Sequence, residues 1–211
     1  MSFVKKCISG VMAGWSISIG ATAFLVSQNT AVGAIFFCIG ILMVANFNAM
    51  LVTRVTPLCG YNKAYGVWDI VIAWVTNFIG AFVGAGLLRV SRVWSGVSER
   101  VQTIVNTKCD DSFLSLFALG VLCAALVAYG VLAWIKHSDN KVAQMLYLMF
   151  FITIFVFCGF DHIVANMVYY ALYLLGFGYR SGMVMSLLAV TLGNLVGGYL
   201  IGIIQKYFEK K

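Results

Sequence analysis

The chain has 211 residues, of which 62% are hydrophobic and only 10% are charged, and its mean hydropathy is +0.97. A soluble core of this size cannot bury so many apolar side chains, so the composition excludes a water-soluble globular domain and predicts a protein of the lipid bilayer. The net charge of +7 would suggest a nucleic-acid partner in a soluble protein, but here the Lys and Arg residues fall mainly at the ends of apolar segments. That placement indicates membrane topology, and we expect no nucleic-acid partner.

The first predicted element runs from about Val4 to Val26, which is long enough for a membrane span of about 20 residues. It is also too long for the apolar part of a cleaved signal peptide, so we interpret it as a retained span. The second element, from Ala31 to about Phe47, is apolar but continues into a polar stretch that includes Asn48, Thr53 and Pro57. We therefore expect its helix to break into irregular chain before the next span.

A third span is predicted at about Val67 to Val90, and a fourth at about Ser112 to Ile135. Between them lies the longest connection, from Ser91 to Asp111, which mixes both signs of charge and is basic near its ends. We expect a loop on the outer side of the membrane. Its charges either draw anions toward a pore or belong to an ordinary solvated loop.

The fifth element, from Val142 to Gly178, is too long for one span and has a polar interruption near its middle, at Asp161, His162 and Asn166. A charged side chain at bilayer depth costs ~2.5 kcal/mol or several times more, so such groups are rare and usually line a pathway or cavity. The interruption therefore predicts a functional site. A sixth span follows at about Met183 to Tyr207.

Each half of the chain thus has a broken second element, and such a pattern indicates an inverted repeat with a binding site near the membrane midplane. The sequence of Asn77–Ala81 (NFIGA) also resembles that of Asn194–Gly198 (NLVGG) at the matching place of the other half. We predict an all-α membrane protein with six transmembrane helices in two inverted repeats, about residues 3–95 and 112–208, in one channel domain over 1–211. An even number of spans and the distribution of Lys place both termini in the cytoplasm, with the chain in the inner (plasma) membrane.

His162 is the residue most able to carry chemistry, because an unperturbed imidazole has a pKa of about 6.5 and exchanges protons near neutral pH. An anion that reached the ring in a dry constriction would favour its charged form and accept its proton. The resulting neutral acid crosses an apolar constriction far more cheaply than the ion does. We assign Asp161 a structural role, as the cap of the second half-helix of the broken segment. Asn166 and Asn194 are expected to anchor irregular backbone.

The cysteine and glycine residues indicate different things. The six Cys residues show no CxxC pair and no zinc-like spacing with the two His residues, so we expect no metal and no cofactor. Three glycine pairs have the GxxxG spacing that lets membrane helices approach closely, and they begin at Gly80, Gly193 and Gly198. These pairs indicate tight packing and say little about a substrate.

The residues Gly159–Met167 (GFDHIVANM) resemble the signature that the formate/nitrite transporter family has around its central His. Residues Val190–Gly198 (VTLGNLVGG) are similar to the family's sixth-helix motif, and Leu51–Thr53, in the first broken segment, resemble the family more loosely. The chain therefore resembles, over nearly its whole length, this family of pentameric, aquaporin-like anion channels. The resemblance implies a homopentamer in a lipid bilayer that moves a small monovalent anion such as formate, nitrite or hydrosulfide, together with a proton.

The resemblance also implies roles for individual residues. Four polar residues match the central His that protonates the anion, the Thr that faces it, a Lys of the outer vestibule and a polar residue of the sixth helix: His162, Thr53, Lys108 and Asn194. Four apolar residues fall on positions that form narrow slits: Phe37, Ile41, Leu51 and Phe155. The chain departs from the family in Asp161, where Glu is usual, in Ile163, where Ser is usual, and in the stretch from Arg54 to Leu58, which lacks the usual small residues.

Two other functions fit the same residues. The architecture also suits a channel for a neutral solute such as water or glycerol, whose flux would depend neither on pH nor on His162. A membrane-embedded redox or metal enzyme would use His162, Asp161, His137 and Cys158. That reading is weaker, because His137 lies near a predicted cytoplasmic end and Cys158 alone does not complete a metal site.

Overall fold

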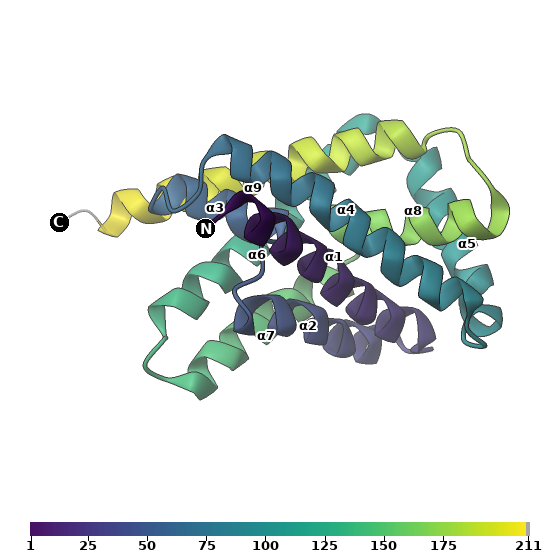
Figure 1. The fold of residues 1–211 in the computed structure, drawn as a ribbon, viewed down its shortest axis with the longest axis horizontal. Helices are drawn as coiled ribbons and strands as arrows, with labels where there is room; N and C mark the ends of the chain where they lie inside the picture. The colour runs from purple at the N-terminus through teal and green to yellow at the C-terminus, as the bar shows by residue number, and fades with distance from the viewer. Residues whose placement is uncertain (210–211) are drawn as a thin grey trace.

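The computed structural model describes residues 1–209, and every element in that range is an α-helix (Figure 1). The helices are α1 (Phe3–Val26), α2 (Thr30–Asn46), α3 (Val52–Tyr61), α4 (Val67–Val90), α5 (Trp94–Asp110), α6 (Phe113–Lys136), α7 (Lys141–Phe157), α8 (Ile163–Phe177) and α9 (Met183–Glu209). Four of them, α1, α4, α6 and α9, are 24 to 27 residues long and apolar enough to cross a membrane. Their positions confirm the four simple spans that the sequence predicts.

The two other apolar segments are each divided into two helices, as predicted. The first break separates α2 from α3, and the second separates α7 from α8. Each break contains a residue in the left-handed region of backbone space, Asn48 at φ 51° and Gly159 at φ 72°. A helix cannot continue through that conformation, and Gly and Asn are the residues that adopt it most readily.

Helices α3 and α8 begin close to each other and run in opposite directions. Their first turns meet where Thr53 Oγ1 lies 2.9 Å from Nε2 of His162. Helix α3 ends beside the end of α9, where the Tyr61 hydroxyl donates to the Glu209 carboxylate, and α8 ends beside α5, against which Phe177 packs. Figure 1 shows both termini at one end of the molecule and α5 at the other. We call these two ends the terminal face and the α5 face.

An asparagine inside α4 holds the first break together. The amide nitrogen of Asn77 donates to the carbonyls of Gly10 in α1, at 2.9 Å, and of Met50 in the break, at 2.8 Å. Its side-chain oxygen accepts the N–H of Val52, the first residue of α3, at 2.8 Å. Without Asn77, the Met50 carbonyl and the Val52 N–H would lack partners, at a cost of about 1–3 kcal/mol each, while the Gly10 carbonyl keeps its bond within α1.

Asn194 in α9 does the same for the second break. Its nitrogen donates to the carbonyls of Gly120 in α6, at 2.9 Å, and of Asp161, at 2.8 Å, and its oxygen accepts the N–H of Ile163 at 2.9 Å. The three bonds correspond one by one to those of Asn77. They confirm that Asn194 anchors irregular backbone, and they explain why an asparagine lies in the middle of α4 and of α9.

The prediction of a loop between the third and fourth spans is wrong, because most of this connection forms helix α5. Val97, Val101, Val105 and Cys109 are buried, at a spacing of four residues that gives one apolar face on a helix. This apolar side of α5 packs on the end of the bundle that we call the α5 face, where α5 contacts α8 and α9. The polar face of α5 is thereby held in a fixed position rather than on a mobile loop.

The GxxxG pairs lie where helices touch, as predicted. A Cβ atom at Gly80 would overlap the backbone of α1, one at Gly193 the backbone of α6, and one at Gly202 the backbone of α3. No larger side chain fits at these three positions unless the helices separate. The close approach keeps the breaks and their anchoring asparagines in register.

Candidate functional site

His162 lies at the centre of the structure, as the residue that caps the N-terminus of α8. It is 2% exposed, and its Nδ1 accepts the N–H of Ala165 at 3.2 Å. A nitrogen that accepts a hydrogen bond carries no proton, so this pattern assigns the proton to Nε2, which then donates to Thr53 Oγ1 at 2.9 Å. The ring is therefore neutral in this arrangement, and both its nitrogens are engaged.

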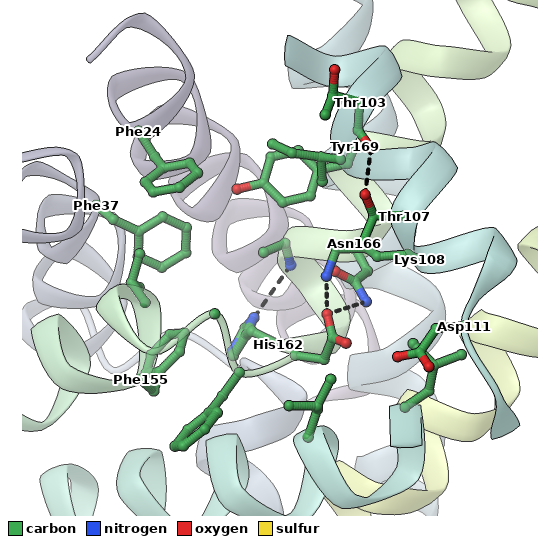
Figure 2. A pocket seen from close by; sticks show the side chains of 18 residues that line it. Phe24, Phe37, Thr103, Thr107, Lys108, Asp111, Phe155, His162, Asn166 and Tyr169 are labelled. Carbon is green, nitrogen blue, oxygen red and sulfur yellow. Dashed lines mark hydrogen bonds and ion pairs between the residues drawn. The ribbon is translucent and has the colours of Figure 1, made fainter. Parts of the chain in front are cut away.

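The expectation that Asp161 caps α8 is wrong, because His162 takes that place. The Asp161 carboxylate instead forms an ion pair with Lys108 of α5 and accepts a hydrogen bond from Asn166 Nδ2 at 3.2 Å (Figure 2). The carbonyl of Asp161 is held by Asn194, and the break directs its side chain away from the helix start. Asn166 thus contacts this carboxylate through its side chain, rather than the backbone of the break that it was expected to anchor.

The ion pair lies almost wholly inside the protein, since the Asp161 side chain is 2% exposed and that of Lys108 16%. Two charges removed from water are stable only when each has a close partner, and removing one partner typically costs about 3–5 kcal/mol. The ion pair therefore ties α5 to the second break. It also leaves Lys108 less free to attract an anion than an unpaired lysine would be.

A cavity of about 280 Å³ lies between His162 and the α5 face (Figure 2). Its polar lining comes from α5 and the start of α8: Thr103, Thr107, Lys108, Asp111, Asp161, His162, Asn166 and Tyr169. Its apolar lining includes Phe24, Phe37 and Phe155. We call this space the outer cavity, and it is large enough to hold a small ion with several waters.

Aromatic rings close the inner end of the outer cavity. The centroids of Phe37 and Phe155 are 5.9 Å apart, with the rings nearly perpendicular. The centroids of Phe155 and His162 are 5.7 Å apart, with the rings nearly parallel. Both Phe side chains are buried. The imidazole is therefore part of a narrow aromatic wall.

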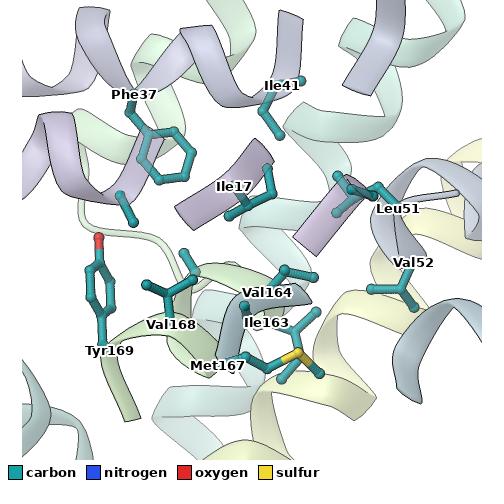
Figure 3. Packing of buried hydrophobic residues seen from close by; sticks show 14 of the residues in the cluster. Ile17, Phe37, Ile41, Leu51, Val52, Ile163, Val164, Met167, Val168 and Tyr169 are labelled. Carbon is teal, nitrogen blue, oxygen red and sulfur yellow. The ribbon is translucent and has the colours of Figure 1, made fainter. Parts of the chain in front are cut away.

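A second and much smaller space lies beyond this wall, toward the terminal face. Its volume is about 10 Å³, and its lining includes Ile41, Leu51 and Arg54. A void needs roughly 10–15 Å³ to hold one water molecule, so this inner void has room for one at most. Figure 3 shows Phe37, Ile41 and Leu51 among the packed apolar side chains of the centre. In this conformation the passage is closed to ions.

The structure brings the predicted site residues together around these two spaces. Six of them line the outer cavity: His162, Lys108, Asp161, Asn166, Phe37 and Phe155. Ile41 and Leu51 line the inner void. Thr53 and Asn194 line neither space; Thr53 contacts the imidazole and Asn194 holds the backbone beside it.

Sequence reasoning missed several of the lining residues. Thr107 and Tyr169 line the outer cavity, and Arg54 lines the inner void. Thr103, Thr107 and Asp111 repeat every four residues along α5, and this polar stripe was the available signal. For Arg54, the only signal was a positive charge in an apolar segment.

These features can be compared with known proteins. The family model described as "Formate/nitrite transporter" matches residues 1–208. The chain belongs to the formate/nitrite transporter family. One relative is the formate channel FocA of Haemophilus influenzae, which is 27% identical over 247 residues and covers 96% of this chain and 86% of the relative. Membership in a family of transporters argues against the enzyme alternative.

Solved structures show the fold. A structure described as a pentameric formate channel with formate bound has a TM-score of 0.82 at 23% identity, covering 98% of this chain and 96% of that one. The aquaglyceroporin from Plasmodium falciparum has a TM-score of 0.65 at 14% identity, covering 99% and 97%. The all-helical fold of this family member is therefore aquaporin-like.

The described residues do not form the ligand set that the metal-enzyme alternative requires. Among residues 1–209, no three His, Cys, Asp or Glu side chains are placed to hold a metal ion together. His137 stacks on Tyr147, with ring centroids 4.8 Å apart, at the end of α6, and Cys158 is exposed in the second break. Neither residue is among those that line the outer cavity with His162.

Proposed function

We propose that the chain moves small monovalent weak-acid anions across a membrane, with formate and nitrite as the first candidates and hydrosulfide close behind. The observation that carries this proposal is the position of His162, which stands between a polar cavity and an apolar constriction. A group able to give a proton is thus located where an ion must lose its water. The family and the formate channels among its relatives support the same substrate class.

The anion enters from the α5 face. The ammonium group of Lys108 supplies positive charge in the outer cavity, partly balanced by Asp161. The N-termini of α3 and α8 both lie at the centre of the structure. A helix N-terminus carries a partial positive charge of about half an elementary charge. Among residues 1–209, the N–H groups of Thr53 and Val164, each second in its helix, have no hydrogen-bond partner. These groups favour an anion beside His162.

His162 then supplies the proton. In the neutral ring the Nδ1 lone pair is engaged by the N–H of Ala165, so a proton from water can bind there only when this cap opens, at a cost of about 0.5–2 kcal/mol. An adjacent anion offsets that cost by its opposite charge. Transfer of the proton to the anion gives a neutral acid, restores the neutral ring and lets the cap close. One proton from the outer cavity therefore leaves with each anion.

The apolar constriction selects for the neutral acid. Phe37 and Phe155 on one side of His162, and Ile41 and Leu51 on the other, offer no group that replaces the water around an ion. Burying an unpaired charge is far more costly than burying a neutral polar molecule that keeps part of its hydrogen bonding. The four side chains thus let protonated substrate pass when they move apart and hold back the free ion.

We further propose six membrane crossings in two inverted repeats within one channel domain. The first repeat holds α1 to α4, about residues 3–95, and the second holds α6 to α9, about residues 112–208. The matching bonds of Asn77 and Asn194 support this division, because each asparagine holds the first residue of a half-helix, α3 or α8. In it, α2 with α3 and α7 with α8 each make one crossing, and α5 joins the repeats.

The assembly and location follow from the same proposal. The pentameric formate channel of similar fold supports a homopentamer. Many large apolar side chains are exposed on the single chain, which suits contacts with lipid and with neighbouring copies. Both termini lie on one face, and the Lys-rich ends of the spans support a cytoplasmic location for that face in the plasma membrane.

A proteoliposome uptake assay tests the proposed function. Formate, nitrite, hydrosulfide, lactate and glycerol are offered over a series of external pH values to the native chain and to His162→Asn. We expect uptake of the weak-acid anions to rise as external pH falls and the substitution to remove this dependence. Thr53→Val is the matched control, since it takes away the partner of Nε2 but leaves the imidazole. Glycerol uptake that is independent of both pH and His162 would instead show a neutral-solute channel.

A further inference from the structure

Arg54 is a buried cation that has no counter-charge among residues 1–209. It is 9% exposed and lies one residue after Thr53, in the first turn of α3. Its Nη2 donates to Asn48 Oδ1 at 2.8 Å, and Nη1 approaches the carbonyl of Ala49 at 3.5 Å and the Tyr65 hydroxyl at 3.4 Å. All three partners are neutral. Within residues 1–209, the three ion pairs involve other cations, at Lys6, Lys108 and Arg180.

This arrangement is unusual for arginine. A guanidinium is always charged in proteins and is seldom buried unless an anion pairs with it. It has five N–H donors, of which the three contacts use at most three, so at least two remain for another partner. Nε in particular forms no hydrogen bond with any residue from 1 to 209. Within the described part of the chain, the guanidinium therefore lacks an anionic partner and keeps free N–H donors.

The position of Arg54 tells what could complete it. The side chain lines the inner void together with Leu51, on the terminal side of His162. A further cavity of about 250 Å³ lies beyond this void and shares Ala45 and Trp134 with it. Asn48, the partner of Arg54, and Lys141 line that cavity. A charged group thus stands between the apolar constriction and a space on the terminal face.

We propose that Arg54 is an anion-binding site on the terminal side of the constriction, and that it takes a planar anion with two oxygen acceptors. This inference rests on the proposed function and extends it, since it names a second station on the same pathway. The guanidinium plane offers parallel N–H donors that match two oxygens of one anion. Formate and nitrite have that shape, whereas hydrosulfide presents a single sulfur.

The two sides of the pathway then differ. On the α5 side, the charge of Lys108 is balanced by Asp161, while on the terminal side no carboxylate of residues 1–209 balances Arg54. An anion is therefore held more strongly on the terminal side. There, Arg54 receives the anion when the neutral acid loses its proton after crossing, and it gathers the anion for passage in the other direction.

A purely structural role predicts something else. Through Asn48 and Ala49, Arg54 also pins the first break, so its loss could disturb both sides of the pathway equally. Tyr65→Phe provides a matched control, because it removes one contact of the guanidinium and keeps the charge. The two roles separate when flux is measured from each face.

The test uses membrane vesicles of both orientations that contain the native full chain, Arg54→Gln, Arg54→Lys or Tyr65→Phe. Protease accessibility of a C-terminal tag identifies the exposed face. For flux that starts at the terminal face, we expect Arg54→Gln to raise the half-saturating formate concentration about tenfold. This is the usual loss of affinity when one hydrogen bond to a charged group is removed. The value from the α5 face and both values for Tyr65→Phe should stay within twofold. No change from the terminal face, or an equal change from both faces, would overturn the inference.

The lysine variant tests the planar fit. It keeps the charge but not the paired donors, so the preference for formate over hydrosulfide from the terminal face should shrink several-fold. An unchanged preference would overturn this part of the proposal. If native vesicles move no more formate than protein-free ones, the proposed function fails instead.

A binding measurement needs no transport and no substitution of Arg54. Trp134 lines both the inner void beside Arg54 and the adjoining cavity of about 250 Å³. Iodide that enters this cavity and binds Arg54 as the void opens should therefore quench the fluorescence of Trp134 in the purified native chain, and formate should relieve the quenching. Trp134→Phe, measured in parallel, removes the signal of this one tryptophan. Quenching of Trp134 that does not saturate, or that formate does not relieve, would contradict a site at Arg54.

Discussion

The two anchoring asparagines make a quantitative test of the fold. We replace Asn194 with Leu, which is similar in volume and suits an apolar helix but forms no hydrogen bonds. The change leaves the Asp161 carbonyl and the Ile163 N–H of the second break without partners, and it removes an additional bond to the Gly120 carbonyl, which keeps its partner within α6. Because Asn77 makes the same three bonds, Asn77→Leu should have a similar effect on the first break.

The expected loss follows from these contacts. Each buried group without a partner costs about 1–3 kcal/mol, so the two groups together cost about 2–6 kcal/mol. Burying a leucine side chain returns about 2 kcal/mol, and waters that enter the break reduce the cost further. We expect a net loss of about 2 kcal/mol in the free energy of unfolding for either variant.

The assay is equilibrium unfolding of the purified chain in mixed detergent micelles with an increasing fraction of denaturing detergent. Asn106→Leu is the matched control, because Asn106 Oδ1 is buried and has no hydrogen-bond partner among the residues that the structure describes. Its replacement should change the free energy of unfolding by less than about 1 kcal/mol. If Asn194→Leu were as stable as the control, the anchoring role that we derive from its three bonds would be refuted.

Three further predictions concern the ion pair, the helix contacts and the aromatic wall. Lys108→Gln leaves Asp161 buried and unpaired, so it should lower stability by about 3–5 kcal/mol; the double change with Asp161→Asn should restore stability in unfolding assays but not formate uptake. Gly193→Leu should prevent α6 and α9 from packing and abolish the folded protein in gel filtration, whereas Gly86→Ala, with open space around it, should fold normally. Phe155→Ala should widen the aromatic wall and raise lactate uptake relative to formate uptake, and an unchanged ratio would exclude this ring as a size filter.

The long spans and both breaks were predictable, because they depend on composition over many residues. Four apolar runs of sufficient length gave α1, α4, α6 and α9, and polar interruptions marked the breaks. The short likeness between the sequences that begin at Asn77 and Asn194 also had a physical basis, since both amides bond to matching backbone groups. Helix α5 was missed because its average composition is polar, and this average hides apolar residues that repeat every four positions.

Side-chain directions within the breaks were not predictable. Regular helices fix where each side chain points, but a break has no period from which to calculate it. The cap of α8 is therefore His162 rather than Asp161, and the Asp161 carboxylate reaches Lys108, which is 53 residues away in the chain. The neutral environment of Arg54 likewise depends on partners brought together by folding.

The central claim is that a proton crosses with each anion after meeting His162. The most direct measurement follows formate uptake and internal acidification together in proteoliposomes whose membrane potential is clamped at several values. The account predicts one proton for each formate and a rate that does not change with the potential, because the crossing species is neutral. Formate uptake that follows the membrane potential without acidification would contradict it.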